Sequence, residues 1–472
     1  MLFRSQTIVN AANSLISKNK NQIQKQVFSK NEIGSLIKII AGTTDHEEGF
    51  LVCNQIVDLL HNAKADYRDF AILYRTNAQS RIFEEVLRKK NIPYKIYGGL
   101  SFYQRKEIKD MLAYFRLAIN PRDEEAFKRV INYPARGIGD TSIEKVQKAA
   151  LDQNKSIWEI CSELSLYNPG VGGGIAAKIV QFVGLITGFA TKLKTVDAYE
   201  IANQIANASG ILKELKEEKT IESMTRLENI EELINGIREY VENASEPAEA
   251  TLDNYIQSIA LLTDLDEEKE EDFNKVTLMT IHSAKGLEFK YVYIVGLEEK
   301  LFPSQFSLEN PQELEEERRL FYVAITRAEL AVCLSYAAMR FKWGSMESCV
   351  PSRFIREIDE AFIETDTGSK QDKEEAWWDE SPAAVSKKAK VNFSKPGISP
   401  AKSSVPPILI ENFEPDDPGL VKAGMQVLHE RFGAGKVLQV EGVLPNAKAT
   451  VFFQSSGQKM LLLKFARLKI LN

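Results

Sequence analysis

The clearest hydrophobic pattern in the chain is a pair of apolar runs, Val276–Ile281 and Tyr291–Val295, on either side of a short polar segment. Runs of this length that are rich in Val, Ile and Tyr are typical of buried strands. Buried strands of this kind usually belong to a parallel sheet covered by helices. The polar segment between them, His282–Glu288, then predicts a ligand-binding loop at the carboxyl end of a strand, where α/β proteins place their ligands. A plain strand–turn–strand connection is the simpler alternative.

The first hundred residues alternate between helical and strand-like patterns. Ile8, Ala11 and Leu15 lie at helical spacing in the first of these elements. The predicted helices are Ser5–Ile16, Glu47–Asn62 and Gln79–Lys90, and the predicted strands are Ser35–Ala41, Asp69–Arg75 and Pro93–Tyr97. This alternation predicts βαβ units and therefore a parallel sheet.

Between Lys106 and Asp272 helical stripes replace the strand pattern almost completely. This stretch has about the length of one domain. Because the strand pattern resumes at Val276, we expect an all-helical domain inserted into an α/β domain. The α/β domain would be formed by residues 1–104 and 273–364, and the helical domain by residues 105–272.

Two further parts are expected after the α/β domain. Residues 365–417 are rich in Ser, Pro, Lys and Ala, and this composition predicts a disordered linker. Residues 418–472 contain short strand patterns separated by glycines, which predict a small antiparallel β-barrel. Its expected strands are Gln426–His429, Gly435–Val440, Ala449–Phe453 and Lys459–Leu463.

Composition and charge narrow the class of protein. The hydrophobic fraction of 44% and the aromatic fraction of 9% are those of an ordinary soluble globular protein. No uninterrupted apolar run approaches the ~18 residues of a membrane span, so no membrane segment is expected. Four scattered cysteines without a CxxC pair favour reduced thiols in a cytosol over a zinc site or a disulfide framework. Residues 418–472 carry 8 Lys and Arg against 2 Asp and Glu in a chain of net charge -6, so a basic C-terminal module follows an acidic body.

A phosphate-binding loop of the form GxxxxGK(S/T) is absent from the sequence. The nearest approach is Gly435-Lys436, but Val437 follows it, and the segment is typical of a turn between strands. No acidic strand end of the kind that holds the magnesium ion of a nucleotide stands out. The sequence therefore predicts that this chain does not bind Mg-nucleotide through a phosphate loop of its own.

A second informative segment, Glu315–Ala328, predicts a helix that leads into a strand at Leu330–Tyr336. Helical spacing places three of its apolar residues toward the sheet, namely Leu320, Val323 and Ala324. Arg319 and Arg327 then lie on other faces of the helix. An arginine near a helix end suits a phosphate, because the guanidinium group is always charged and forms bidentate hydrogen bonds with anions. The alternative is that these arginines pair with the glutamates of the same helix.

TIHSAKGLEF and EEERRLFYVAITRA together resemble motifs V and VI of the superfamily-1 DNA helicases of the UvrD/PcrA/Rep type. AILYRTNAQSRIFEEVL, YGGLSFYQRKEIKDMLAYFRL, NYPARGIGDTSIEKV, RLENIEEL and PSRFIREI are similar to further segments of that family. The tail, HERFGAGKVLQVEG and KFARLKIL, is similar to the family's Tudor-like terminal domain. The resemblance covers nearly the whole chain. It implies an α/β fold with a RecA-like parallel sheet (domain 2A), a large all-helical inserted domain (2B), a disordered linker and a small SH3/Tudor-like β-barrel.

The resemblance implies a set of residues that faces ATP. Arg327 matches the arginine finger that reaches the γ-phosphate, and Glu288 matches a glutamate that accepts hydrogen bonds from the ribose. Arg4 and Phe3 fall where the family has a second phosphate-contacting arginine and an adenine-stacking tyrosine. The spacing after Arg4 is one residue shorter than in the family, so either a residue is deleted or the resemblance begins at Ser5. The simpler alternatives are a structural ion pair for Arg327 and a turn cap for Glu288.

The resemblance also implies contacts with nucleic acid. His282, Arg75 and Asn77 match positions along the path of single-stranded DNA, where an imidazole stacks on a nucleotide and a guanidinium contacts phosphate. The alternative for His282 is a loop histidine whose hydrogen bonds are made within the protein, and the alternative for Asn77 is an N-cap role. Gly137 and Gly139 lie in a predicted turn where the family grips duplex DNA through backbone N–H groups. An ordinary helix–turn–helix corner is the alternative there.

The function implied by the resemblance is ATP-dependent 3′-to-5′ movement on DNA, in DNA repair or replication, in the cytoplasm of a bacterium. ATP with Mg²⁺ would lie between two RecA-like domains, and this chain would supply the second one, without metal ligands and inactive by itself. The implied partners are single-stranded DNA, its junction with duplex DNA, the missing first RecA-like domain and, through residues 418–472, RNA polymerase. Two alternatives stay open, a non-catalytic module that grips DNA or RNA polymerase, and a fragment with no independent role.

Overall fold

The computed structural model describes residues 4–20, 27–244, 246, 249–264, 273–342 and 345–364, together with short stretches between 421 and 470. Phe3 and the predicted linker, residues 365–417, lie outside the described residues. The chain divides into two compact units, Met1–Asp372 and Lys373–Asn472, and each is considered by itself.

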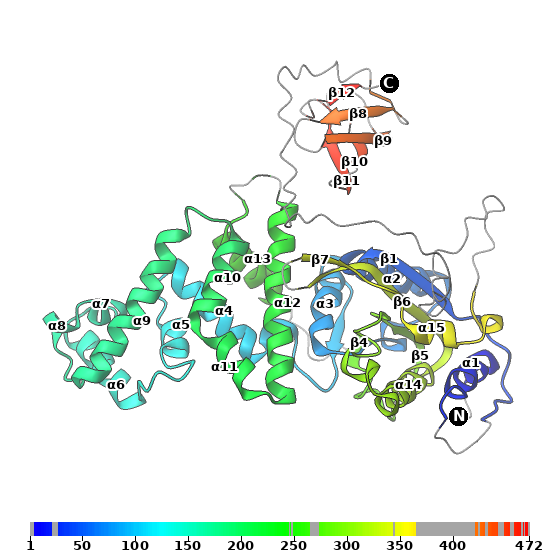
Figure 1. Ribbon diagram of the computed structural model, residues 1–472, viewed down its shortest axis with the longest axis horizontal. Coiled ribbons are helices and arrows are strands. Elements are labelled where there is room, and N and C mark those ends of the chain that lie inside the picture. The colour runs from blue at the N-terminus through cyan, green and yellow to red at the C-terminus, as the bar shows by residue number, and fades with distance from the viewer. Residues whose placement is uncertain are drawn as a thin grey trace, which may run out of the picture. The chain divides into compact units, whose positions relative to one another are not determined.

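The first unit is built on a seven-stranded sheet of order β1-β6-β5-β2-β4-β3, with β7 paired to β6 (Figure 1). The strands are β1 (Lys38–Thr44), β2 (Phe70–Tyr74), β3 (Tyr94–Ile96), β4 (Val276–Thr280), β5 (Phe289–Ile294), β6 (Ala328–Lys342) and β7 (Ser345–Ser348). The pairs along the main order are parallel, and β7 is antiparallel to β6. The predicted parallel sheet is therefore confirmed. The hairpin formed by the long β6 and β7 was not predicted.

Helices cover both faces of this sheet because successive side chains of its strands point to opposite faces. The covering helices are α1 (Gln6–Ile16), α2 (Asp45–Asn62), α3 (Ser80–Lys89), α14 (Pro311–Ile325) and α15 (Arg353–Glu357). In the fully buried strand β2, Ala71 and Leu73 pack on one face with α1, α14 and α15. Phe70, Ile72 and Tyr74 pack on the other face with α2 and α3. Short 3-10 helices lie in the connections: η1 (Tyr67–Asp69), η2 (Asn77–Gln79), η3 (Phe102–Gln104), η4 (Phe306–Leu308) and η5 (Glu360–Phe362).

Residues 106–264, here called the helical block, form a separate group of helices between β3 and β4 (Figure 1). They are α4 (Lys106–Ile119), α5 (Glu124–Val130), α6 (Asp140–Asp152), α7 (Ile157–Ser162), α8 (Leu164–Tyr167), α9 (Gly173–Lys192), α10 (Ala198–Ser209), α11 (Ile211–Glu218), α12 (Ile221–Asn243) and α13 (Leu252–Asp264). The block has its own core, in which Tyr114, Phe127 and Phe182 are buried. Because β3 and β4 are paired neighbours, the chain leaves the sheet and returns to it at one place.

Among the helices of the described residues, α9 alone is long and apolar enough to cross a membrane by length and composition. Lys178 and Gln181 interrupt its apolar sequence, so no membrane segment was predicted there. Ile179, Phe182 and Ile186 of this helix are buried in the core of the helical block. A core helix passes the same test, so α9 is weak grounds for a membrane span.

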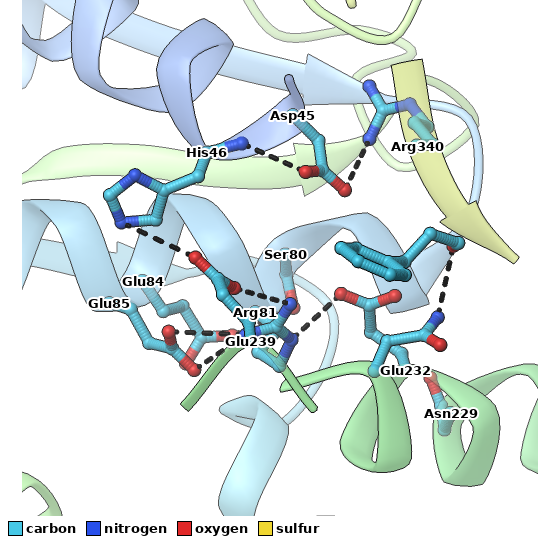
Figure 2. Close-up of polar contacts among 12 residues, drawn as sticks. Asp45, His46, Ser80, Arg81, Glu84, Glu85, Asn229, Glu232, Glu239 and Arg340 are labelled. Carbon is cyan, nitrogen blue, oxygen red and sulfur yellow. Dashed lines mark hydrogen bonds and ion pairs between the residues drawn. The ribbon is translucent and has the colours of Figure 1, made fainter. Parts of the chain in front are cut away.

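Arg81 of α3 connects the sheet-bearing part to the helical block (Figure 2). Its Nε donates to Glu232 Oε1 at 2.7 Å, and its Nη2 lies 3.7 Å from Glu239 Oε2, both on α12. Glu85, on its own helix, accepts from Nη1 at 3.1 Å. Burial alone would lower the pKa of Arg81, but these carboxylates raise that pKa well above its ordinary value. One buried guanidinium surrounded by carboxylates therefore contributes to this junction, beside contacts such as Asn235 Nδ2 to the Phe341 carbonyl oxygen at 3.2 Å.

The raised pKa of Glu231 on α12 predicts that the stability of the folded protein depends on pH. Burial, and next the charge of Glu228, raise the pKa of the Glu231 carboxyl group to about 8. Its Oε1 is buried and has no hydrogen-bond partner among the described residues. The folded protein thus binds a proton that the unfolded chain releases near its ordinary pKa of 4.5, so the free energy of unfolding falls as the pH rises from 4.5 to about 8.

We therefore expect Glu231→Gln to be more stable than the wild type at pH 8.5, by about 1–2 kcal/mol after allowance for partial exposure. The difference is expected to shrink toward zero near pH 4.5, where both proteins carry a neutral side chain. Thermal unfolding followed by circular dichroism across this pH range measures it. Glu218→Gln, at an exposed position on α11, is the control. A stabilisation by Glu231→Gln that does not change with pH would contradict the prediction.

The second unit contains a five-stranded antiparallel sheet of order β11-β10-β9-β8-β12. Its strands are β8 (Gln426–His429), β9 (Gly433–Glu441), β10 (Lys448–Phe453), β11 (Gly457–Leu462) and β12 (Leu468–Ile470). Val427, Val437 and Val451 are buried in its core. The predicted small antiparallel β-structure is confirmed, and β12 is the strand that the glycine-separated pattern did not predict.

Candidate functional site

The polar loop after β4 runs from the side of the sheet where its parallel strands end to the side where they begin. These two sides are here called the carboxyl edge and the amino edge. Because β4 and β5 run parallel on either side of β2, the segment His282–Glu288 leads from the carboxyl end of β4 to the amino end of β5. The loop turns at Gly286, whose φ of +90° favours glycine. His282 therefore lies at the carboxyl edge and Glu288 at the amino edge. The prediction that this loop lies at the carboxyl ends of the strands is correct for His282 and wrong for Glu288.

Arg4, Glu288, Thr326 and Arg327 meet at the amino edge of the sheet and are here called the amino-edge cluster. Arg4 directly precedes the N-cap of α1, and Thr326 and Arg327 join α14 to β6. Arg4 is 3% exposed, its Nη2 donates to Glu288 Oε1 at 2.6 Å, and its Nε donates to the Thr326 carbonyl oxygen. The main-chain oxygen of Arg4 accepts from Ser29 Oγ at 2.5 Å, which holds this residue in place. The arginine whose spacing departs from the family's motif thus lies beside Glu288 and Arg327.

Arg327 is held beside Arg4 by main-chain oxygens. Its Nε donates to the Val323 carbonyl oxygen and its Nη1 to the Leu287 carbonyl oxygen, both at 3.1 Å. Burial, and next the positive charge of Arg4, lower the pKa of Arg327, whereas Glu288 opposes the shift. Two guanidinium groups beside one carboxylate form a site that suits an anion with several negative charges.

The alternative reading of the arginines in Glu315–Ala328 holds for Arg319, which pairs with glutamates of its own helix. Its Nη2 lies 3.7 Å from Glu315 Oε2, and its Nη1 contacts Glu316. The hydrogen bonds of Arg327 go to two carbonyl oxygens and to the Thr326 hydroxyl instead. The two arginines of this segment are therefore in different environments, and Arg327 is the one that lies in the amino-edge cluster.

The carboxyl edge brings Arg75 and His282 together. Arg75, directly after β2, forks onto Glu317 of α14, with Nη2 to Oε1 at 2.7 Å and Nε to Oε2 at 3.1 Å. This pairing was not predicted, and it means that the guanidinium already has an anionic partner. His282 lines a pocket of about 320 Å³ together with Lys285 and Leu320. Burial and the charge of Arg75 lower the pKa of His282, which Glu317 opposes, so the imidazole is neutral near pH 7 and suited to stacking.

The predicted buried face of α14 was partly wrong. Phe321, Ala324 and Ile325 are buried against the sheet, and Leu320 packs partly buried against the same core. Val323, together with Leu320, lines the pocket beside His282. The buried stripe is thus rotated by about one residue, because the large ring of Phe321 packs with the rings of two further phenylalanines in the core, Phe302 and Phe354. Of the predicted face, Ala324 is buried in this core, and Leu320 packs against it, partly buried.

Asn77 is exposed and lies within η2, next to Arg75. The N-cap of η2 is Thr76, in a capping box with Gln79. The alternative that Asn77 acts as the N-cap is therefore wrong. The Asn77 carbonyl oxygen accepts from Arg105 Nη1 at 3.0 Å, which fixes its backbone at this edge of the sheet.

The glycine turn of the helical block lies between α5 and α6. Gly137 has a φ of +69°, which favours glycine, and Gly139 is the N-cap of α6. Asn132 Oδ1 accepts from the N–H groups of Arg136 and Ile138, each at 3.0 Å, so the turn has a defined shape. A Cβ atom on Gly137 would lie 2.9 Å from the ammonium nitrogen of Lys178 on α9, so this turn is small and carries a positive charge beside it.

Tyr322 and Thr326 were not predicted from the sequence, although Thr326 belongs to the amino-edge cluster and Tyr322 lies beside it. Thr326 Oγ1 accepts from Arg327 Nη2 at 3.3 Å. Burial raises the pKa of Tyr322, while the charges of Arg4 and Arg327 lower it, which places this ring near both arginines. Both residues lie within the segment EEERRLFYVAITRA, so their proximity to Arg327 in the sequence was the available signal.

Comparison with known proteins identifies the family. Residues 3–339 match the UvrD-like helicase C-terminal domain, and residues 423–469 match the PcrA/UvrD tudor domain. The chain is 37% identical over 464 residues to an ATP-dependent DNA helicase PcrA of Staphylococcus aureus, which covers 98% of this chain and 60% of that protein. It is 36% identical over 466 residues to an ATP-dependent DNA helicase PcrA of Staphylococcus epidermidis, with the same coverage. The chain thus spans about 60% of the length of these relatives, and it belongs to the UvrD-like helicase family, of which it carries the C-terminal portion.

Proposed function

We propose that the chain forms one half of the motor of an ATP-dependent DNA helicase. Residues 1–104 and 273–364 would be its second RecA-like domain, residues 105–272 the inserted helical domain, residues 365–417 a linker and residues 418–472 a docking module. The observation that carries the proposal is that Arg4, Glu288 and Arg327 converge at one edge of the sheet, while His282 and Arg75 lie at the opposite edge.

In this proposal the amino-edge cluster contributes to the binding of ATP. Arg327 is the arginine finger, Arg4 a second phosphate contact and Glu288 the acceptor for the ribose hydroxyls, with Phe3 beside the adenine. The donor set fits, since guanidinium groups bind polyphosphates and a carboxylate accepts from a diol. Bound ATP supplies the phosphoanhydride that is cleaved. Its magnesium ion and the remaining phosphate contacts are assigned to the portion of the PcrA relatives that this chain does not match.

Single-stranded DNA would pass the carboxyl edge, where His282 stacks on a nucleotide and Arg75 and Asn77 contact the backbone. Gly137 and Gly139 would approach phosphates of the duplex at the junction with single-stranded DNA, through main-chain N–H groups. The proposed movement is 3′ to 5′, in DNA repair or replication in a bacterial cytoplasm. The segment His282–Glu288 reaches from the nucleotide edge to the DNA edge, which gives a direct physical path between the two ligands.

The tudor match supports a second candidate function, a non-catalytic module that docks the chain to a partner. Residues 418–472 carry 8 Lys and Arg against 2 Asp and Glu, so an acidic surface of RNA polymerase or the DNA backbone suits them. Capture of purified RNA polymerase by the chain with and without residues 418–472 distinguishes this candidate from the motor.

The motor proposal is tested with the purified chain and with a fusion. We expect the chain alone to show no DNA-stimulated ATP hydrolysis. Fused behind the portion of Staphylococcus aureus PcrA that it does not match, the chain is expected to restore hydrolysis and to unwind duplexes with a 3′ tail in preference to a 5′ tail. Turnover by the chain alone would contradict the assignment of the magnesium and phosphate contacts to the other portion. A folded fusion without hydrolysis would contradict the motor proposal.

A further inference from the structure

Arg4 presents almost none of its surface to solvent, and its terminal Nη2 is bound by the more exposed Glu288. The Arg4 side chain is 3% exposed, whereas the Glu288 side chain is 38% exposed. The Nε of Arg4 points inward to the Thr326 carbonyl oxygen, and its Nη2 donates to Glu288 Oε1 at 2.6 Å. A phosphate that is to bind Nη2 of Arg4 must therefore take the place of the Glu288 carboxylate.

The segment Leu287-Glu288 holds both arginines of the amino-edge cluster. The carboxylate of Glu288 binds Arg4, and the carbonyl oxygen of the preceding residue, Leu287, accepts from Arg327 Nη1 at 3.1 Å. Gly286, with a φ of +90°, directly precedes this segment. A displacement of these two residues would thus break the main contacts that the loop makes with Arg4 and Arg327 at the same time.

The positive charges of Arg4 and Arg327 lie close together in the partly buried amino-edge cluster, and they require a negative counterion. Glu288 provides it in this structure, and a polyphosphate provides the same charge with a matching geometry for guanidinium. We propose that Glu288 is an internal competitor for the phosphate site, and that occupation of its carboxylate by a ribose releases Arg4 to bind the terminal phosphate. This inference rests on the proposed function, and it assigns to Glu288 a positioning role in addition to ribose contact.

The inference is tested on the full chain with inorganic triphosphate, which has phosphates but no ribose. Binding is measured by isothermal titration calorimetry at low ionic strength, where charge–charge contacts are least screened. We expect Glu288→Gln to bind triphosphate about tenfold or more tightly than the wild type, since it removes the competing charge but keeps the shape of the side chain. Arg327→Gln, combined with Glu288→Gln, is expected to abolish the gain.

Two further variants separate the Arg4–Glu288 contact from a general charge effect. Glu309→Gln changes the net charge equally at an exposed position after η4, and we expect no gain from it. Glu288→Asp keeps the charge but shortens the side chain by one methylene, and an affinity between those of the wild type and Glu288→Gln is expected. Thermal unfolding establishes that every variant is folded.

The outcomes distinguish this inference from the motor proposal. If Glu309→Gln and Glu288→Gln increase the affinity for triphosphate equally, the competitor role of Glu288 is overturned. It is also overturned if Glu288→Gln shows no measurable binding of triphosphate. In both cases the fusion still tests the motor proposal independently. Triphosphate binding that is unaffected by Arg327→Gln overturns the assignment of this cluster to phosphate, and with it both proposals. A gain that is specific to Glu288 and requires Arg327 supports the competitor role.

Discussion

Replacing Arg327 with alanine in the fusion with Staphylococcus aureus PcrA is expected to lower the rate of DNA-stimulated ATP hydrolysis by roughly 10³-fold or more, because arginine fingers contribute about that much in other nucleotide hydrolases. The guanidinium stabilises negative charge that develops on the transferred phosphoryl group. Arg327 is held for this role by the Val323 and Leu287 carbonyl oxygens at 3.1 Å. The measured quantity is kcat in a steady-state assay at saturating DNA and ATP.

The matched control for Arg327→Ala is Arg353→Ala, which removes an arginine from an exposed ion pair with Glu299 at 2.8 Å. We expect this control to change kcat by less than about twofold, since exposed ion pairs contribute little. Arg327→Lys is expected to restore only a small part of the rate, because an ammonium group cannot fork onto two phosphate oxygens. A loss of less than about tenfold in Arg327→Ala would contradict the arginine-finger assignment.

Replacing Arg340 with methionine is expected to lower the free energy of unfolding of the first unit by about 3–5 kcal/mol, the cost of removing one partner from a buried ion pair. Arg340 Nη2 lies 2.5 Å from Glu48 Oε2, and its Nε lies 2.7 Å from Glu298 Oε2. Both glutamate side chains are fully buried. Burial raises the pKa of Glu48, Arg340 opposes this shift, and Glu298 adds to it, so loss of Arg340 leaves two buried carboxylates without their counterion.

Urea unfolding measures this effect, with Arg353→Ala as the control that is expected to cost less than about 1 kcal/mol. The triple variant Arg340→Met, Glu48→Gln, Glu298→Gln tests the cause, since it removes the buried charges together. We expect it to recover most of the stability, because an uncharged buried group costs far less than an unpaired carboxylate. A triple variant as unstable as Arg340→Met alone would show that packing, and not charge, accounts for the loss.

Much of the fold could be predicted because its central elements have strong local patterns. The run FAILY of β2 and the run VTLMT of β4 are buried strands, as their mostly apolar sequences predict. Weaker patterns led to errors where packing decided the outcome. The buried face of α14 is set by stacking of Phe321 with Phe354, with 5.6 Å between ring centroids, and not by spacing alone. The strand β12 has only three residues and was not predicted, whereas β3, of the same length, was.

The residues of the candidate site could be predicted singly, but not their partners. Arg327, Glu288 and His282 were identified from two motif-like segments. The pairing of Arg4 with Glu288 and that of Arg75 with Glu317 join residues that are more than two hundred positions apart in the chain. No local pattern contains such information, because it depends on the order in which the strands enter the sheet.

The sequence by itself determined most of the segments that become strands and helices, and which residues carry charge, because those properties depend on side-chain type and on spacing within a few residues. Only the tertiary structure decided where the charges meet. Since β4 and β5 both run parallel to β2, the loop His282–Glu288 must cross from one edge of the sheet to the other. That crossing separates His282 from Glu288, and it brings Glu288 against Arg4 at the edge where α14 ends and β6 begins.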